Sequence, residues 1–140
     1  MMRSFLFAIL QLCSTALWAQ SDTTVFHAYL YNNEEEVYLR INLYDQNITI
    51  PGHELYGELP GFLGKERNSF CWPIISAKMT SHNKAKLQMI NDFGSEDATV
   101  TLTRKNDSTY VLQHVEGSVI RVPYKGKWRK LPKTLLLKRR

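Results

Sequence analysis

The feature that most constrains this chain is an alternation of apolar and polar residues with a period of two. In residues 37–44 the odd positions hold Val, Leu, Ile and Leu, whereas the even positions are polar or amphipathic. Successive side chains of a β-strand point to opposite faces, so such a segment turns one face to a core and the other to water. The alternation recurs in residues 84–89 and 98–103. This pattern predicts a sheet that is covered on one side.

Turn-forming residues divide the second half of the chain at intervals of about ten to twelve residues. Glycine, asparagine and aspartate tolerate the backbone angles of tight hairpins, and they fall in residues 81–83, 92–95, 106–107, 116–117 and 125–126. Intervals of this length hold a strand but no helical crossover, which favours antiparallel pairing. No segment has a sustained helical period.

Nine segments are candidate strands, of which three alternate clearly and one is short. They are residues 26–31, 37–44, 47–50, 74–80, 84–89, 98–103, 109–115, 118–124 and 134–139. Consecutive hairpins favour a meander that closes into a barrel, because closure leaves no exposed strand edge. The alternative is a β-sandwich, which usually needs longer Greek-key connections. We therefore predict an all-β fold, an antiparallel meander of about eight or nine short strands in a closed or partly open barrel.

The number of strands and the spacing of their turns resemble those of the small lipocalin-like, or calycin, barrels of exported bacterial proteins. The resemblance covers roughly residues 23–139. It implies a lipocalin-like barrel with a mouth at one end.

The N-terminus has the layout of a secretory signal. One basic residue, Arg3, precedes an apolar run over residues 5–19 that ends in alanine. This run is shorter than the roughly 20 apolar residues that a membrane-spanning helix needs. We predict a signal peptide over residues 1–20 that is removed, a single all-β domain over residues 21–140, and a periplasmic or secreted location. No transmembrane segment is expected after signal removal, and a retained anchor helix is the alternative.

The cysteine count bears on how the domain is held together. Cys13 lies in the predicted signal peptide, so Cys71 is the only thiol of the mature chain and no intramolecular disulfide can form. Cys71 is flanked by Phe70 and Trp72, which favours a buried, unreactive thiol over a nucleophile. We expect packing and backbone hydrogen bonds to stabilise the fold.

The sequence contains no motif that predicts an enzyme. The four histidines are far apart in the chain and show no local metal-ligand spacing, and neither a nucleophile elbow nor a phosphate-binding loop is present. Glu54 and Glu58 are better explained as solvated loop residues than as an acid–base pair. Asp92, Glu96 and Asp97 lack the length and periodicity of a calcium loop. We predict no catalytic residue, no metal and no cofactor, with a small hydrolase as the remaining alternative.

Aromatic side chains supply the candidate binding residues. The polar face of residues 37–44 suits a sugar or a protein partner, and equally an ordinary solvent face with cross-strand tyrosine pairs. Residues 51–69 contain four glycines and two prolines among apolar residues. They form either a binding lip over the barrel mouth or barrel corners where the chain bends sharply. The predicted ligand- or partner-binding residues are Tyr38, Arg40, Tyr44, Tyr56, Phe62 and Trp72.

Charge is distributed unevenly along the chain. Residues 21–100 carry 6 basic and 11 acidic side chains, whereas residues 101–140 carry 11 basic and 2 acidic ones. A basic stripe with aromatic residues attracts an anionic surface or polysaccharide, and nucleic acid is not expected for an exported protein. Alternatively, the basic residues solvate an edge strand or pair with the acidic half. The predicted anion-binding residues are Arg121, Lys127, Trp128, Arg129 and Lys130.

Together these features predict an exported, non-enzymatic binding protein that takes a small ligand or a glycan in its barrel mouth. The alternative is a protein-interaction module, such as a secreted enzyme inhibitor or a subunit of an envelope complex. An apolar interior cavity of about 300 Å³ or more would favour a small ligand. A filled core with an exposed aromatic patch would favour a partner.

Overall fold

The computed structural model describes residues 24–140, so the predicted signal peptide lies outside the described residues. The strands are β1 His27–Asn32, β2 Val37–Asn42, β3 Gly61–Lys65, β4 Cys71–Ser81, β5 Lys84–Ile90, β6 Asp97–Arg104, β7 Thr109–Gly117, β8 Arg121–Tyr124, β9 Lys127–Lys130 and β10 Thr134–Arg139. A single turn of 3-10 helix covers Glu54–Tyr56. Within residues 24–140, no helix has the length and hydrophobicity needed to cross a membrane.

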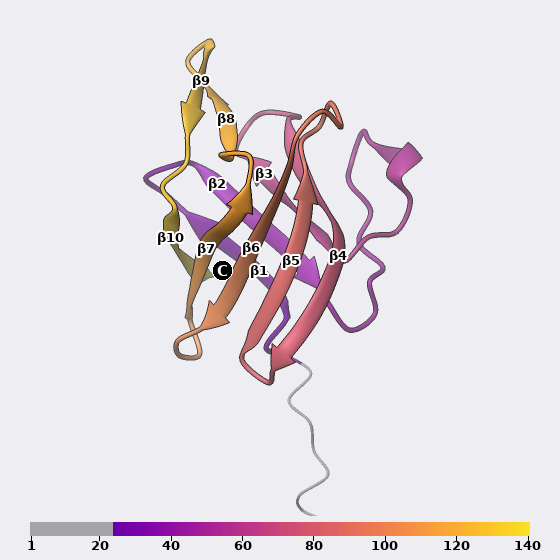
Figure 1. The fold of residues 1–140 in the computed structure, drawn as a ribbon, viewed down its shortest axis with the longest axis vertical. Helices are drawn as coiled ribbons and strands as arrows, with labels where there is room; N and C mark the ends of the chain where they lie inside the picture. Colours follow the sequence, from indigo (N-terminus) through magenta and orange to yellow (C-terminus); the bar gives the residue numbers. More distant parts are fainter. Residues whose placement is uncertain (1–23) are drawn as a thin grey trace, which may run out of the picture.

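Eight strands close into an antiparallel barrel in the order β1-β10-β7-β6-β5-β4-β3-β2 (Figure 1). From β1 to β7 each strand pairs with its neighbour in the chain, and β10 closes the ring by pairing with both β7 and β1. Between β7 and β10, β8 and β9 form a separate two-stranded hairpin. This hairpin projects from one end of the barrel (Figure 1). The predicted all-β barrel is confirmed, and the sandwich alternative is wrong.

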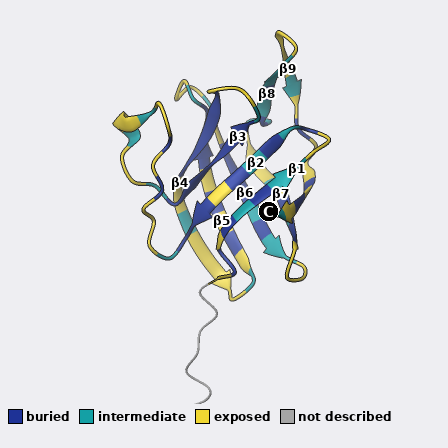
Figure 2. Cartoon of the chain, turned by 180° about the vertical axis from the view of Figure 1, so that it is seen from behind, coloured by how far each residue is buried: buried dark blue, intermediate teal, exposed yellow. Residues whose placement is uncertain are grey.

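The alternation in the sequence becomes the inside and the outside of the barrel (Figure 2). In β5, Ala85, Leu87 and Met89 are fully buried, whereas the residues between them are exposed. Large side chains from other strands fill the interior in the same way. The largest fully buried side chains are Trp72, Tyr110, Phe26, Leu30, Leu39, Ile41, Leu63, Ile74, Leu87, Met89, Leu102 and Leu137.

The strand β3 was not among the expected strands, because its glycines interrupt the pattern. It pairs with β2 and β4 and is buried along its whole length (Figure 2). A Cβ atom at Gly61 would overlap the main-chain carbonyl oxygen of Arg40, and one at Gly64 would overlap the ring of Tyr38. The glycines therefore allow a close approach of β2 within the barrel wall.

Two other expectations differ from the structure. Residues 47–50 form no named strand, because they make only an isolated bridge between Ile48 and Leu59. Lys127–Lys130 was expected only as a basic segment and forms β9.

The connection between β2 and β3 covers the outer wall of the barrel. Ile48 and Ile50 from this connection pack with Phe62 and Cys71, which point outward from β3 and β4. Partly buried Tyr38, Tyr56 and Leu59 pack against this small apolar cluster. We call residues 43–60 the covering segment. It lies on the wall, so the interpretation of residues 51–69 as a lip over the mouth is wrong for this part of the chain.

Candidate functional site

A cleft opens at the end of the barrel from which the β8–β9 hairpin projects. Three connections meet there, namely residues 66–70, 91–96 and 118–133. The cleft, which we call the mouth cleft, has a volume of about 230 Å³. Its lining combines aromatic with polar side chains, as ligand sites commonly do. The lining residues are Phe70, Trp72, Asn91, Phe93, Ser95, Glu96, Arg121 and Trp128.

Three aromatic rings from the three connections form one wall of the mouth cleft. The ring centroid of Phe70 lies 5.0 Å from that of Trp128 and 6.0 Å from that of Phe93. The rings of Phe93 and Trp128 meet edge to face, with centroids 6.2 Å apart. Phe70 is buried, but Phe93 is 70% and Trp128 is 54% exposed. Two large aromatic side chains therefore offer apolar surface beside an open cleft.

Trp72 forms the buried floor of the mouth cleft. Its indole N–H donates a hydrogen bond of 2.9 Å to the main-chain carbonyl of Arg121, the first residue of β8. This bond ties the base of the hairpin to the barrel core. The predicted binding residue Trp72 therefore belongs to the cleft, where it has a positioning role.

The polar residues of the cleft divide into two groups. The side-chain oxygen of Asn91 accepts hydrogen bonds from the backbone N–H groups of Ser95 and Glu96, and its amide donates to the Ser95 hydroxyl. Asn91 thus shapes the turn between β5 and β6. In contrast, the carboxylate of Glu96 and the guanidinium of Arg121 make no ion pair or side-chain hydrogen bond within residues 24–140. Both charged groups are free to bind polar groups of a ligand.

The predicted anion-binding residues lie on different sides of the hairpin. Arg121 and Trp128 line the mouth cleft, whereas Arg129 forms an ion pair with Glu35 in the acidic half of the chain. The Arg129 Nε atom lies 3.0 Å from an oxygen of Glu35, and its guanidinium stacks over the ring of Tyr124. A second ion pair of this kind joins Arg140 to Glu66 at 3.6 Å. The pairing of basic with acidic residues within one molecule therefore accounts for part of the charge pattern.

Lys127 and Lys130 are the exposed basic members of the same set. The register of β8 with β9 places Lys130 opposite Arg121 and Lys127 opposite Tyr124. Register partners of an antiparallel pair lie on the same face, so Arg121, Trp128 and Lys130 share one face of the hairpin and Lys127 and Arg129 share the other.

Most of the other predicted binding residues lie on the outer wall, away from the mouth cleft. The ring of Tyr38 stacks on that of Tyr29 with centroids 5.4 Å apart and meets the edge of Phe62 at 5.7 Å. Arg40 is exposed on this wall, opposite Phe62 in the register. The wall is thus an ordinary sheet face with cross-strand aromatic contacts, covered in part by the covering segment.

Tyr44 and Tyr56 have local structural partners. The Tyr44 hydroxyl accepts a hydrogen bond of 3.1 Å from the backbone N–H of Phe26. The Tyr56 hydroxyl donates one of 3.0 Å to the main-chain carbonyl of Asp92. Of the six predicted ligand-binding residues, the structure brings only Trp72 into the mouth cleft.

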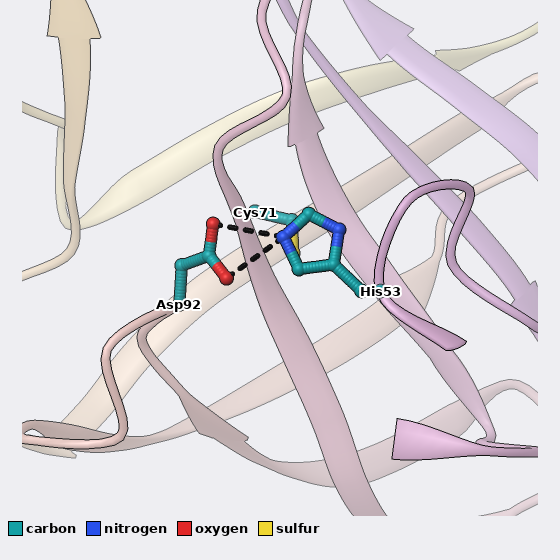
Figure 3. A group of neighbouring side chains, drawn as sticks. All are labelled: His53, Cys71 and Asp92. Atoms are coloured by element: carbon teal, nitrogen blue, oxygen red, sulfur yellow. Dashed lines mark hydrogen bonds and ion pairs between the residues drawn. The ribbon is translucent and has the colours of Figure 1, made fainter. Parts of the chain in front are cut away.

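A second cluster, of side chains that offer potential metal-ligand atoms, lies behind the mouth cleft on the outer wall. Figure 3 shows His53 of the covering segment, Cys71 of β4 and Asp92 of the β5–β6 turn pointing toward one another. The His53 Nε2 atom lies 2.9 and 3.0 Å from the two carboxylate oxygens of Asp92. Its Nδ1 atom lies 3.2 Å from the main-chain carbonyl of Pro51.

The environment of this cluster changes the proton affinities of its members. Burial, and then the charge of Asp92, raise the pKa of the Cys71 thiol to about 12. A thiol with this pKa is protonated at neutral pH, which agrees with the expected unreactive cysteine. Burial by itself disfavours the charged imidazole of His53, but hydrogen bonds to Pro51 and Asp92 outweigh it and raise the pKa of His53.

The residue that sequence reasoning missed most clearly is Phe93. It lies in the middle of the turn-forming sequence Asp92-Phe93-Gly94-Ser95. A large aromatic side chain at a hairpin turn lies too far from the core to be buried there. Its position in the turn could therefore have identified Phe93 as a candidate binding residue. No comparable sequence feature identifies Phe70 or Glu96, because their places in the mouth cleft depend on which connections meet at this end of the barrel.

Comparison of this chain with protein-family models, with curated proteins and with solved structures gives no match. Its likeness to lipocalin-like proteins is one of barrel architecture, with eight antiparallel strands closed on themselves.

Proposed function

We propose that this protein is an exported, non-enzymatic binding protein whose ligand is a sugar unit, free or within a glycan, held in the mouth cleft. The observation that supports this proposal is that exposed aromatic rings lie beside charged groups that form no ion pair within residues 24–140. Phe93 and Trp128 present apolar surface, and Glu96 and Arg121 lie beside them without partners in residues 24–140.

The chemistry of a sugar matches this combination of side chains. A sugar ring has an apolar face of C–H groups, which packs on the faces of aromatic rings. Its hydroxyl groups form hydrogen bonds, which are strongest with charged partners such as the Glu96 carboxylate and the Arg121 guanidinium. The arginine also favours sugars that carry a carboxylate or another anionic group.

The size of the site restricts the ligand. The mouth cleft, of about 230 Å³, is smaller than the roughly 300–1,000 Å³ of sites for drug-sized ligands. The barrel interior is occupied by large buried side chains such as Trp72, Tyr110 and Met89. A long lipid inside the barrel is therefore a poor candidate, and one small ring at the mouth is a good one.

The lining of the cleft supports a binding role over hydrolysis. Glycoside hydrolysis generally uses two carboxylates that flank the scissile bond. Among the lining residues only Glu96 is acidic. The nearby carboxylate of Asp92 is held by His53.

Export is part of the proposal and is supported by the N-terminal sequence. Arg3 and the apolar run over residues 5–19 have the layout of a secretory signal. Glycans are abundant outside the cell membrane, where such a protein would act.

A protein-interaction module is the second candidate function, and a filled barrel core beside the exposed rings of Phe93 and Trp128 is the arrangement expected for it. The sugar is placed first because the mouth cleft also presents Glu96 and Arg121, which make no ion pair within residues 24–140. The projecting β8–β9 hairpin carries the half-exposed Trp128 between the exposed Lys127 and the half-buried Arg129. An aromatic anchor with basic neighbours is suited to an acidic protein surface.

Sugar titrations followed by nuclear magnetic resonance test the first proposal. The mature chain has two tryptophans, Trp72 and Trp128, so their indole N–H signals are readily assigned. We expect neutral or acidic monosaccharides and their methyl glycosides to shift the Trp128 signal in a saturable manner. Trp128→Ala, followed by the Trp72 signal, should no longer bind, and Glu96→Gln or Arg121→Gln should weaken binding about tenfold or more.

The matched control is Lys127→Gln, which changes a neighbour of Trp128 that does not line the mouth cleft. This variant should bind sugar as the parent protein does. If no sugar in the panel moves the Trp128 signal, the sugar proposal fails. Capture of one envelope protein by a photo-crosslinker at position 127 would then favour the interaction module.

A further inference from the structure

The cluster behind the mouth cleft joins three elements that are distant in the sequence. His53 lies in the covering segment, Cys71 is the first residue of β4, and Asp92 lies in the β5–β6 turn (Figure 3). Each offers one potential ligand atom, and these atoms lie within 4.8 Å of one another. From this geometry we infer that His53, Cys71 and Asp92 form a zinc-binding site with one open coordination position.

The orientation of the imidazole supports this inference. A carbonyl oxygen can only accept a hydrogen bond, so the contact of His53 Nδ1 with the Pro51 carbonyl requires the proton on Nδ1. The Nε2 atom is thereby directed toward Asp92. Metal-binding histidines generally have this arrangement, in which one nitrogen donates to a carbonyl and the other coordinates the ion.

The donor set selects the kind of metal. A thiolate, an imidazole and a carboxylate together suit Zn²⁺, which accepts sulfur, nitrogen and oxygen ligands. Calcium and magnesium prefer oxygen ligands alone. Binding replaces both the proton of the Cys71 thiol and the Nε2 proton that His53 donates to the Asp92 carboxylate, and the two protons are released to solvent.

The spacing requires only a small adjustment of the side chains. With zinc–sulfur bonds of about 2.3 Å and zinc–nitrogen or zinc–oxygen bonds of about 2.0–2.2 Å, the ligand atoms of a tetrahedral site lie about 3.5 Å apart. The largest separation in the cluster exceeds this by little more than 1 Å, given its limit of 4.8 Å. The imidazole and the carboxylate, now 2.9 Å apart, would separate slightly to admit the ion.

The burial of the three residues leaves an approach from one side. Cys71 is buried beneath the covering segment, whereas the side chains of His53 and Asp92 are 16% and 17% exposed. An ion can reach the cluster past these two residues. Three protein ligands leave the fourth position to water or to an exogenous ligand, as in catalytic zinc sites.

Cobalt is a suitable probe, because Co²⁺ takes the same ligands as Zn²⁺ and absorbs light. The reduced mature chain should be used without a histidine tag, since a tag would bind the metal. We expect one equivalent of Co²⁺ to give a thiolate-to-cobalt charge-transfer band in the near ultraviolet. One equivalent of Zn²⁺ should then remove that band.

Variants separate the three ligands from other residues. Cys71→Ala should remove the charge-transfer band completely, and far-ultraviolet circular dichroism should show that the barrel is retained. His53→Gln and Asp92→Asn should each weaken Co²⁺ binding at least tenfold. His82→Gln, which changes an exposed histidine at another hairpin, is the matched control and should bind as the parent chain does.

X-ray absorption of the zinc-loaded parent chain tests the inference without any variant. One sulfur ligand together with nitrogen and oxygen ligands would support it. Zinc coordinated by nitrogen and oxygen alone, or cobalt that binds without a charge-transfer band, would overturn it. In that case the His53–Asp92 pair is a salt bridge that attaches the covering segment to the β5–β6 turn.

Discussion

The indole N–H of Trp72 lies 2.9 Å from the main-chain carbonyl oxygen of Arg121 and donates a hydrogen bond to it. Trp72 belongs to the barrel core, whereas Arg121 begins the projecting hairpin. The hydrogen bond therefore connects the interior of the barrel with the element that carries Trp128. It fixes the base of this hairpin, whose Trp128 ring packs against Phe70 in one wall of the mouth cleft.

Replacing Trp72 with phenylalanine should destabilise the protein and loosen the hairpin. Trp72→Phe removes the donor and leaves the Arg121 carbonyl unsatisfied, which costs about 1–3 kcal/mol. Urea unfolding measures this change. Trp128→Phe alters a half-exposed tryptophan and should change the unfolding free energy by less than about 0.5 kcal/mol. Equal losses in the two variants would contradict the role assigned to Trp72.

Replacement of either glycine of β3 by alanine should destabilise the protein, although the two clashes differ in kind. Gly64→Ala places a methyl group against the ring of Tyr38, and Gly61→Ala places one against the main-chain carbonyl of Arg40. We expect each to cost about 1–3 kcal/mol in unfolding free energy, because overpacking strains a close-packed structure.

A second substitution distinguishes the two clashes. Tyr38→Leu should restore much of the stability lost in Gly64→Ala, since the obstructing atoms belong to a side chain. It should not rescue Gly61→Ala, where the obstruction is backbone. Thermal unfolding of the single and double variants provides the measurement, and rescue of both glycine variants would refute this explanation.

The ion pair between Lys65 and Glu36 should make stability depend on acid pH. A hydrogen bond from Lys65 and its charge lower the pKa of Glu36 below the ordinary value of 4.5. The unfolded chain then binds a proton more readily than the folded one, so the stabilisation is present above pH 4.5 and is lost as pH falls through the lowered pKa.

Urea unfolding at a series of acid pH values checks this. Glu36→Gln should flatten the acid limb of the stability profile, and 1 M NaCl should reduce the difference between the parent chain and the variant, because salt screens a partly exposed pair. An unchanged acid limb in Glu36→Gln would rule out this contribution.

The buried hydroxyl of Tyr110 should make the protein sensitive to alkali. It donates a hydrogen bond to the main-chain carbonyl of Val25 and accepts one of 2.8 Å from Arg139. Burial raises the pKa of Tyr110, although Arg139 opposes this effect. The folded chain thus holds this proton more tightly, and its contribution is lost as pH rises above the ordinary pKa of about 10.

Comparison of the parent chain with Tyr110→Phe tests this contribution. At pH 8 the variant should be less stable by about 1–3 kcal/mol, because the Val25 carbonyl loses its donor. The difference should shrink as pH rises beyond about 10. A difference that stays constant across this range would contradict the assignment.

The sequence predicted the strands whose two faces have different environments. β2, β5 and β6 alternate clearly in sequence, because one face meets the core and the other carries polar or amphipathic side chains, most of which are exposed or half-buried. β3 does not show this alternation, because Leu63 points into the barrel while Phe62 packs under the covering segment. When both faces are buried the alternation disappears, and the glycines that allow close packing look like interruptions.

The alternation of apolar and polar residues predicts neither the mouth cleft nor the cluster of His53, Cys71 and Asp92. Phe70, Phe93 and Trp128 meet because three connections lie at the same end of a closed barrel. His53, Cys71 and Asp92 are separated by 18 and 21 positions in the sequence, so no local spacing links them. Only the path of the covering segment along the outer wall brings His53 to the other two.

The pairing of β1 with β10 has a consequence for how the protein is made. Leu30 with Arg139 and Tyr31 with Lys138 are the register partners at this seam, and they join the beginning of the domain to its end. Contacts so distant along a chain form late in folding. While β10 is still inside the ribosome, β1 and β7 are the unpaired edges of an open sheet. Emergence of β10 is therefore the event that allows the ring to close.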